Sequence, residues 1–111
     1  MRSDRERLLD ILEAIERIEL QATRGRAAFD QNELAQTAII RWIEIIGEAA
    51  RGLSGDLRQA PPEVPWRQMV AMRNVVVHGY FDIDIELVWS VVKNDLPKLA
   101  VQVRSIVEAM G

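Results

Sequence analysis

The chain has 111 residues, with 17 acidic and 14 basic side chains, a net charge of −3, a single histidine and no cysteine. This length is typical of one domain, and we expect residues 1–111 to form a single domain. The absence of cysteine excludes disulfides, thiolate metal sites and cysteine nucleophiles, and one histidine excludes a zinc site built mainly from imidazoles unless subunits share it. The acidic excess excludes a protein that coats nucleic acid or anionic membrane nonspecifically, but not one with a local basic site.

The N-terminal segment is charged and leads into an amphipathic stretch, which is not the pattern of a signal peptide. The apolar runs are short, Val75–Val77 among them, and fall far below the length of a bilayer span. We therefore expect a cytoplasmic protein that does not contact a membrane.

A capping box predicts the start of the first helix. Ser3 is followed three residues later by Glu6, which is the spacing of that motif. Behind it, apolar residues recur at spacings of three and four and indicate one buried helix face: Leu8, Ile11, Leu12, Ile15 and Ile18. Gly25 can adopt a positive φ and stop the helix, so we expect it to run from about Asp4 to about Arg24.

Asp30 and Glu33 repeat the capping-box spacing and predict a second helix from about Gln31 to about Leu53. Its apolar residues cover a wide arc, which is typical of a helix that packs against several partners or lies partly in a subunit interface. The remaining polar stripe is narrow and consists of Arg41, Glu44, Glu48 and Arg51. Gly47, in the interior, costs about 1 kcal/mol relative to alanine, which indicates a close helix contact there.

Glycines and prolines between Gly52 and Pro65 predict a loop, after which Trp66 to about Val77 forms a short third helix. Gly79 ends that helix, and Asp82 is expected to cap a fourth one. The segment Asn94–Pro97 indicates a stop and a restart, with Asp95 as the cap of a fifth helix behind it. Because no strand alternation competes with this pattern, we predict an all-α, up-and-down bundle of four to five helices.

Chemically distinctive residues concentrate between Arg73 and Tyr80, where a cation, the only imidazole of the chain and a phenol occur together. His78 is expected in the last turn of the third helix, where backbone carbonyls favour the protonated imidazole. Arg73 lies about one and a half turns earlier, and its planar guanidinium can reach the same pocket. An arginine that binds phosphate beside a histidine that moves protons can cleave RNA through its own 2′-hydroxyl without a metal.

The same residues also have ordinary structural interpretations. A lone histidine at a helix end is often a cap, and Arg73 can simply pair with Glu44 or Glu48. These two glutamates can orient Arg73 or bind a metal, although their alternation with arginines favours salt bridges. The tryptophans fall at apolar positions, which favours packing over base stacking: Trp42, Trp66 and Trp89.

The pattern Arg73…His78-Gly79-Tyr80, an Arg-x4-His-x-Tyr motif, resembles the signature of the HepT-like branch of the HEPN-domain ribonuclease toxins. The resemblance covers nearly the whole chain, in order, through the segments Asp4–Ile15, Ile46–Ala50, Pro65–Asn74 and His78–Pro97.

This resemblance implies a helical bundle that dimerises and places the Arg/His segments of two subunits at a shared cleft. It implies a metal-independent endoribonuclease without a cofactor, which acts on RNA and not on DNA and is the toxin of a type VII toxin–antitoxin pair. Arg73 and His78 would be catalytic, and Asn74 would support the pocket. The alternative is a non-catalytic helical adaptor that dimerises and binds a nucleotidyltransferase.

In this family the partner is a minimal nucleotidyltransferase antitoxin, which silences the toxin by transferring AMP to the motif tyrosine, here Tyr80. A phenol on a turn two residues from His78 is accessible to another enzyme, and AMP on it would add bulk and negative charge beside the Arg/His pair. The structural alternative is that Tyr80 packs its ring on the bundle and anchors the turn.

Overall fold

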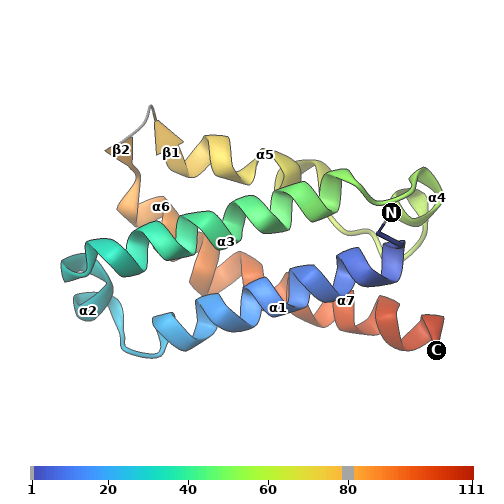
Figure 1. Ribbon diagram of the computed structural model, residues 1–111, viewed down its shortest axis with the longest axis horizontal. Coiled ribbons are helices and arrows are strands. Elements are labelled where there is room, and N and C mark those ends of the chain that lie inside the picture. Colours follow the sequence, from blue (N-terminus) through green and yellow to red (C-terminus); the bar gives the residue numbers. More distant parts are fainter. Residues whose placement is uncertain (1, 79–81) are drawn as a thin grey trace.

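Four helical rods run up and down along the chain, each antiparallel to the one before it (Figure 1). This computed structural model describes residues 2–78 and 82–111. The rods are α1 (Asp4–Ala22), α3 (Glu33–Arg51), α5 (Trp66–Val76), and a continuous fourth rod of α6 (Ile85–Ser90), the π-helical turn η1 (Val91–Asp95) and α7 (Leu96–Met110). Shorter elements join them: α2 (Arg26–Gln31), α4 (Gly55–Gln59) and the strands β1 (Val77–His78) and β2 (Asp82–Ile83). The predicted all-α bundle is confirmed.

The start of α1 is the predicted capping box. The Ser3 hydroxyl accepts a hydrogen bond from the Glu6 N–H, and the Ser3 N–H donates to Glu6 Oε1 at 3.1 Å. The hydrogen bond from the Ser3 N–H is the main cause that lowers the pKa of the Glu6 carboxyl. The helix ends at Ala22, and Gly25 has a φ of 91°, so this glycine redirects the chain as predicted.

The start of α3 differs from the prediction, because Asn32 caps it and Asp30 does not. The Asn32 side chain accepts from the Ala35 N–H at 3.0 Å. Asp30 instead belongs to α2 and pairs with Arg26. Asparagine and aspartate are equally good N-caps, so two candidates this close in sequence cannot be separated by residue type alone.

The wide apolar arc of α3 packs against α1 on one side and α5 on the other. Gly47 lies at a close approach of α3 to α5: a Cβ built on it would be 3.2 Å from the Met69 carbonyl oxygen and 3.3 Å from that of Val70. The predicted close contact at this glycine is therefore confirmed. It sets the spacing between the two helices.

The predicted loop from Gly52 to Pro65 contains α4, which the sequence prediction missed. Ser54 caps this helix by accepting a hydrogen bond from the Leu57 N–H. The Ser54 hydroxyl and N–H in turn donate to the Asp4 carboxylate at 2.6 and 2.9 Å. This contact fastens the connection between α3 and α5 to the start of α1.

A short antiparallel hairpin follows α5, and it corrects two predictions. The helix ends at Val76, and Val77 is extended, with φ −121° and ψ 124°. Val77 pairs with Ile83 and His78 with Asp82, so His78 lies in a strand and not in the last helical turn. β1 contains a single valine, and it forms a strand because β2 returns to pair with it.

The fourth rod corrects two further predictions. Asp84, not Asp82, caps α6, and its side chain accepts from the Leu87 N–H at 3.1 Å. Asp95 makes no side-chain cap, and the chain passes through η1 into α7 without the predicted stop. Pro97 does lie in the first turn of α7, as predicted. The wider π turn accommodates a proline that has no N–H to donate.

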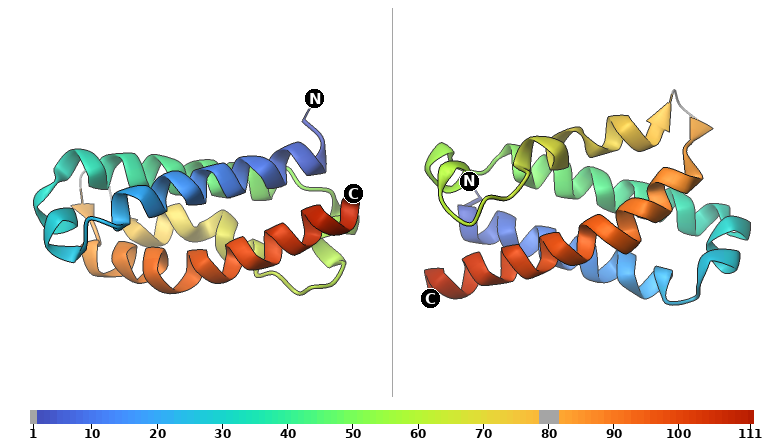
Figure 2. Two further views of the ribbon diagram at one scale, coloured as in Figure 1. Left: turned by 90° about the horizontal axis from the view of Figure 1, so that it is seen from below. Right: turned by 180° about the vertical axis from the view of Figure 1, so that it is seen from behind.

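The core lies between the four rods, and α7 packs along α1 (Figure 2). Among the side chains that the structure describes within residues 2–78 and 82–111, which leaves out that of His78, no polar or charged one is buried. Over the same residues, no helix combines the length and the apolar character that a membrane crossing requires. A cytoplasmic location and a single domain over residues 1–111 stay predictions.

Candidate active site

Arg73 lies in the last turn of α5, on the edge of the helix that faces α3. Its Nε is 3.8 Å from Glu44 Oε2, and 42% of its side chain is exposed. The Nε atom itself is buried and has no hydrogen-bond partner among the described residues. The solvent-accessible surface of this side chain therefore belongs to other atoms, while its Nε faces Glu44.

The pairing of the two α3 glutamates is resolved by the structure. Glu44 faces Arg73 across the α3–α5 contact, whereas Glu48 pairs with Arg41 on its own helix at 3.5 Å. The sequence left both glutamates open as partners of Arg73, and the structure identifies Glu44 as the partner.

Asn74 follows Arg73 in the last turn of α5 and is exposed. The next residue, Val75, is apolar and is exposed as well. The polar residue predicted to support the pocket thus lies at the same end of the bundle as Arg73.

The backbone of His78 lies in β1, two residues beyond the end of α5. The hairpin is tied to that end by the Asp84 N–H, which donates to the Val76 carbonyl at 2.8 Å. Arg73 and the His78 backbone therefore belong to consecutive elements at one end of the bundle. The His78 side chain and Tyr80, the predicted site of modification, lie outside the described part of the chain.

Arg26 of α2, whose role the sequence prediction missed, forms an ion pair with Glu86 in the element after the hairpin. Its guanidinium donates to Glu86 of α6 at 2.6 Å and to Asp30 at 2.7 Å. Hydrogen bonds to Glu86 and then Asp30 raise the pKa of Arg26 further above its usual range. The Arg26–Asp30 spacing is visible in the sequence, but the Glu86 contact spans 60 residues and has no local signal.

All three tryptophans pack against the core, Trp66 buried and Trp42 and Trp89 partly buried. The Trp89 ring stacks at a tilt on Phe29, with 5.2 Å between ring centroids, and Trp66 is buried in the core. The Lys93 ammonium lies 5.6 Å from the Trp89 ring centroid. The packing interpretation is therefore confirmed for the three tryptophans, and the contact of Trp89 with Phe29 joins α2 to the fourth rod.

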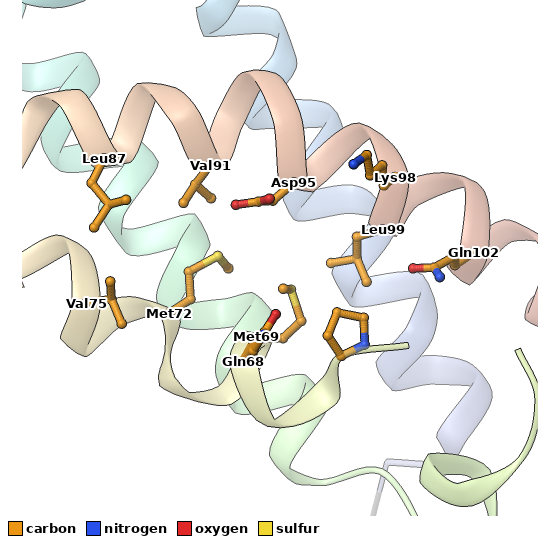
Figure 3. Close-up of a pocket in the computed structure, with 11 residues that line it drawn as sticks. Gln68, Met69, Met72, Val75, Leu87, Val91, Asp95, Lys98, Leu99 and Gln102 are labelled. Atoms are coloured by element: carbon orange, nitrogen blue, oxygen red, sulfur yellow. The ribbon is translucent and has the colours of Figure 1, made fainter. Parts of the chain in front are cut away.

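An apolar cavity of about 370 Å³ lies between α5 and the fourth rod (Figure 3). Met69, Met72 and Leu99 form part of its wall, and Asp95 and Lys98 stand on the fourth-rod side. Arg73 does not line it. Among the residues that the structure describes, no group of three His, Asp or Glu side chains is placed to hold a metal ion.

The Ribonuclease HepT-like family model matches residues 11–106. A protein of Methanocaldococcus jannaschii named as a candidate RNase is 43% identical over 100 residues, which cover 89% of this chain and 92% of that protein. A protein of Thermococcus cleftensis named as a probable ribonuclease HepT is 43% identical over 100 residues, which cover 88% of this chain and 90% of that one. No solved structure matches the chain.

The family match spans all four rods and includes the complete Arg73-to-Tyr80 motif. The resemblance inferred from that motif is therefore confirmed, and the names of the relatives point to ribonuclease activity. The chain belongs to the HepT-like family of HEPN ribonucleases.

Proposed function

We propose that this chain is a metal-independent endoribonuclease whose catalytic residues are Arg73 and His78. The observation that carries the proposal is the half-exposed Arg73 side chain at the end of the bundle from which the His78 hairpin extends. A guanidinium at this place can bind a phosphate of RNA with two parallel hydrogen bonds. Asn74, exposed beside it, supports the pocket.

The reaction is a transesterification within the RNA. A neutral imidazole takes the proton of the 2′-hydroxyl, and the 2′-oxygen attacks the adjacent phosphorus. The bond from phosphorus to the 5′-oxygen breaks, and that oxygen leaves after receiving a proton from an imidazolium. The products are a 2′,3′-cyclic phosphate and a 5′-hydroxyl. Arg73 stabilises the negative charge that develops on the phosphoryl oxygens.

The reaction favours a homodimer as the active form. The reaction uses a neutral imidazole as the base and a protonated imidazole as the acid in the same transition state. A single imidazole cannot be in both forms at once, and each chain has one histidine. Two protomers that share a cleft supply both. A dimer also confines RNA contact to that cleft, which is compatible with a net charge of −3 per chain.

The purified protein is expected to cleave RNA in the presence of EDTA and to leave 2′,3′-cyclic phosphate ends. Mass spectrometry of the products checks the ends, and light scattering checks the dimer. The control substrate carries a single 2′-deoxy nucleotide at the cleavage position, which removes the attacking hydroxyl and should block the cut. Cleavage of the deoxy substrate, or loss of all activity in EDTA, would contradict the proposed chemistry.

The proposal extends to a toxin whose antitoxin is a minimal nucleotidyltransferase that transfers AMP to Tyr80. It is supported by the complete motif in a family member and by the position of Tyr80 after β1, in the connection that follows the catalytic residues. AMP at this place would compete with an RNA phosphate by bulk and by charge.

Incubation with the nucleotidyltransferase and ATP is expected to add roughly 329 Da per transferred group, a mass set by AMP itself. Intact-protein mass spectrometry measures the shift. Tyr80→Phe removes the only phenol of the chain and should abolish the uptake. Equal uptake by the variant would place the modification elsewhere. Uptake by a protein that never cleaves RNA would favour the non-catalytic adaptor.

A further inference from the structure

The α3–α5 contact places one carboxylate directly across from the catalytic arginine. Glu44 lies three residues before Gly47 on α3, and Arg73 lies three residues after Val70 on α5. Because the two helices are antiparallel, both residues lie on the same side of the contact between Gly47 and Val70. The close approach of Gly47 to the Val70 carbonyl therefore aligns the pair. Both side chains are half-buried, at 33% exposed for Glu44 and 42% for Arg73.

The Nε–H of Arg73 is the donor that this carboxylate faces. Nε is buried without a hydrogen-bond partner among the described residues, and its distance of 3.8 Å to Glu44 is too long for a hydrogen bond. A buried cationic donor left unpaired costs free energy, so a small approach of Glu44 is favourable. The carboxylate then lies against the Nε edge of the guanidinium.

We propose that Glu44 is a positioning residue that holds Arg73 by its Nε–H, so that the two terminal amino groups are presented to the RNA phosphate. The guanidinium has five N–H donors in a fixed fork, and one engaged at Nε leaves the four terminal donors for bidentate binding. The role of the phosphate rests on the proposed ribonuclease function. The pairing of Glu44 with Arg73 does not.

Glu48 provides a matched control one turn further along α3. It is 66% exposed and pairs with Arg41, which is itself 59% exposed. An ion pair so open to water contributes little, and it does not reach the catalytic arginine. Glu48→Gln therefore removes the same charge from the same helix without touching Arg73.

The kinetic experiment compares Glu44→Gln with Glu48→Gln in the full-length protein. Glu44→Gln is expected to lower kcat for RNA cleavage by about 10- to 100-fold, since small misplacements of a catalytic group cost this much. Glu48→Gln should leave it almost unchanged. In an Arg73→Lys background, Glu44→Gln should have no further effect, because lysine has no Nε edge to hold. Additive losses would show that Glu44 does not act through Arg73.

A second measurement is independent of catalysis. The Nε–H signal of Arg73 in a ¹⁵N-labelled NMR spectrum is expected to exchange slowly with water in the unmutated protein. Glu44→Gln should speed that exchange and shift the signal, whereas Glu48→Gln should not. If Arg73 does not respond to Glu44→Gln, the positioning role is overturned whatever the activity. If it responds in a protein that cleaves no RNA, the pairing holds and the proposed function fails.

Discussion

Replacing His78 by alanine is expected to lower kcat for RNA cleavage by about 10²- to 10⁴-fold, which is the range that proton transfer by a positioned side chain contributes. The change removes the only imidazole of the chain, and therefore both proton carriers of the proposed dimer. Gel-based cleavage of a labelled RNA measures the loss. In cells, growth arrest on expression of the protein should be relieved by His78→Ala and by Arg73→Ala.

Asp82→Ala is the control for a perturbed hairpin. Asp82 is the exposed partner of His78 in the β1–β2 pair, and the pairing uses backbone groups. Its side chain can be removed while the strand pairing remains, so cleavage should change little. In a mixed dimer of one His78→Ala and one unmutated protomer, a shared cleft lacks one of its two imidazoles and should be nearly inactive, whereas two independent sites would keep about half of the activity. A His78→Ala protein with full activity would refute the catalytic assignment.

Gly47→Leu is expected to lower the free energy of unfolding by about 1–3 kcal/mol, the usual cost of overpacking. Leucine is the better helix former by about 1 kcal/mol, so propensity alone predicts the opposite sign. The Cβ itself decides the outcome, because it would lie 3.2 Å from a backbone carbonyl oxygen that cannot rotate away. Urea unfolding followed by circular dichroism measures the change.

Gly55→Leu serves as the comparison, because a Cβ at Gly55 meets nothing within 4 Å. It should leave the stability nearly unchanged. Gly47→Leu should also lower RNA cleavage in the fraction that stays folded, because a wider α3–α5 spacing moves Glu44 away from Arg73. If the Gly47→Leu protein is as stable as the Gly55→Leu protein, α5 can move away from α3 at a lower cost in free energy than its packing indicates.

Elements with strong local signals were predictable from the sequence. The Ser3–Glu6 capping box, the stop at Gly25 and the start of α5 at Trp66 all depend on residues within a few positions of one another. The tight helix contact at Gly47 was also predictable, because a glycine inside a helix lowers helix stability and usually marks a position where another segment packs closely. In each case the short-range preference and the final fold agree.

The mispredicted boundaries share a different cause. Asp30 and Asp82 are as suitable for capping as the residues used, Asn32 and Asp84, and tertiary packing selects between such neighbours. The β1–β2 hairpin was missed because two-residue strands carry no periodic pattern. Its formation depends on the return of the chain through β2 into α6, where the Asp84 N–H donates to the Val76 carbonyl.

Residue types and spacings along one chain were enough to predict the helical class, the family motif and the candidate residues Arg73, His78 and Tyr80. The pairing of Arg73 with Glu44, the pairing of Glu48 with Arg41 and the position of His78 in a strand became visible in the fold alone. Both glutamates are equivalent in the sequence. The register of two antiparallel helices, set by the closeness of Gly47 to α5, brings just one of them within reach of the arginine.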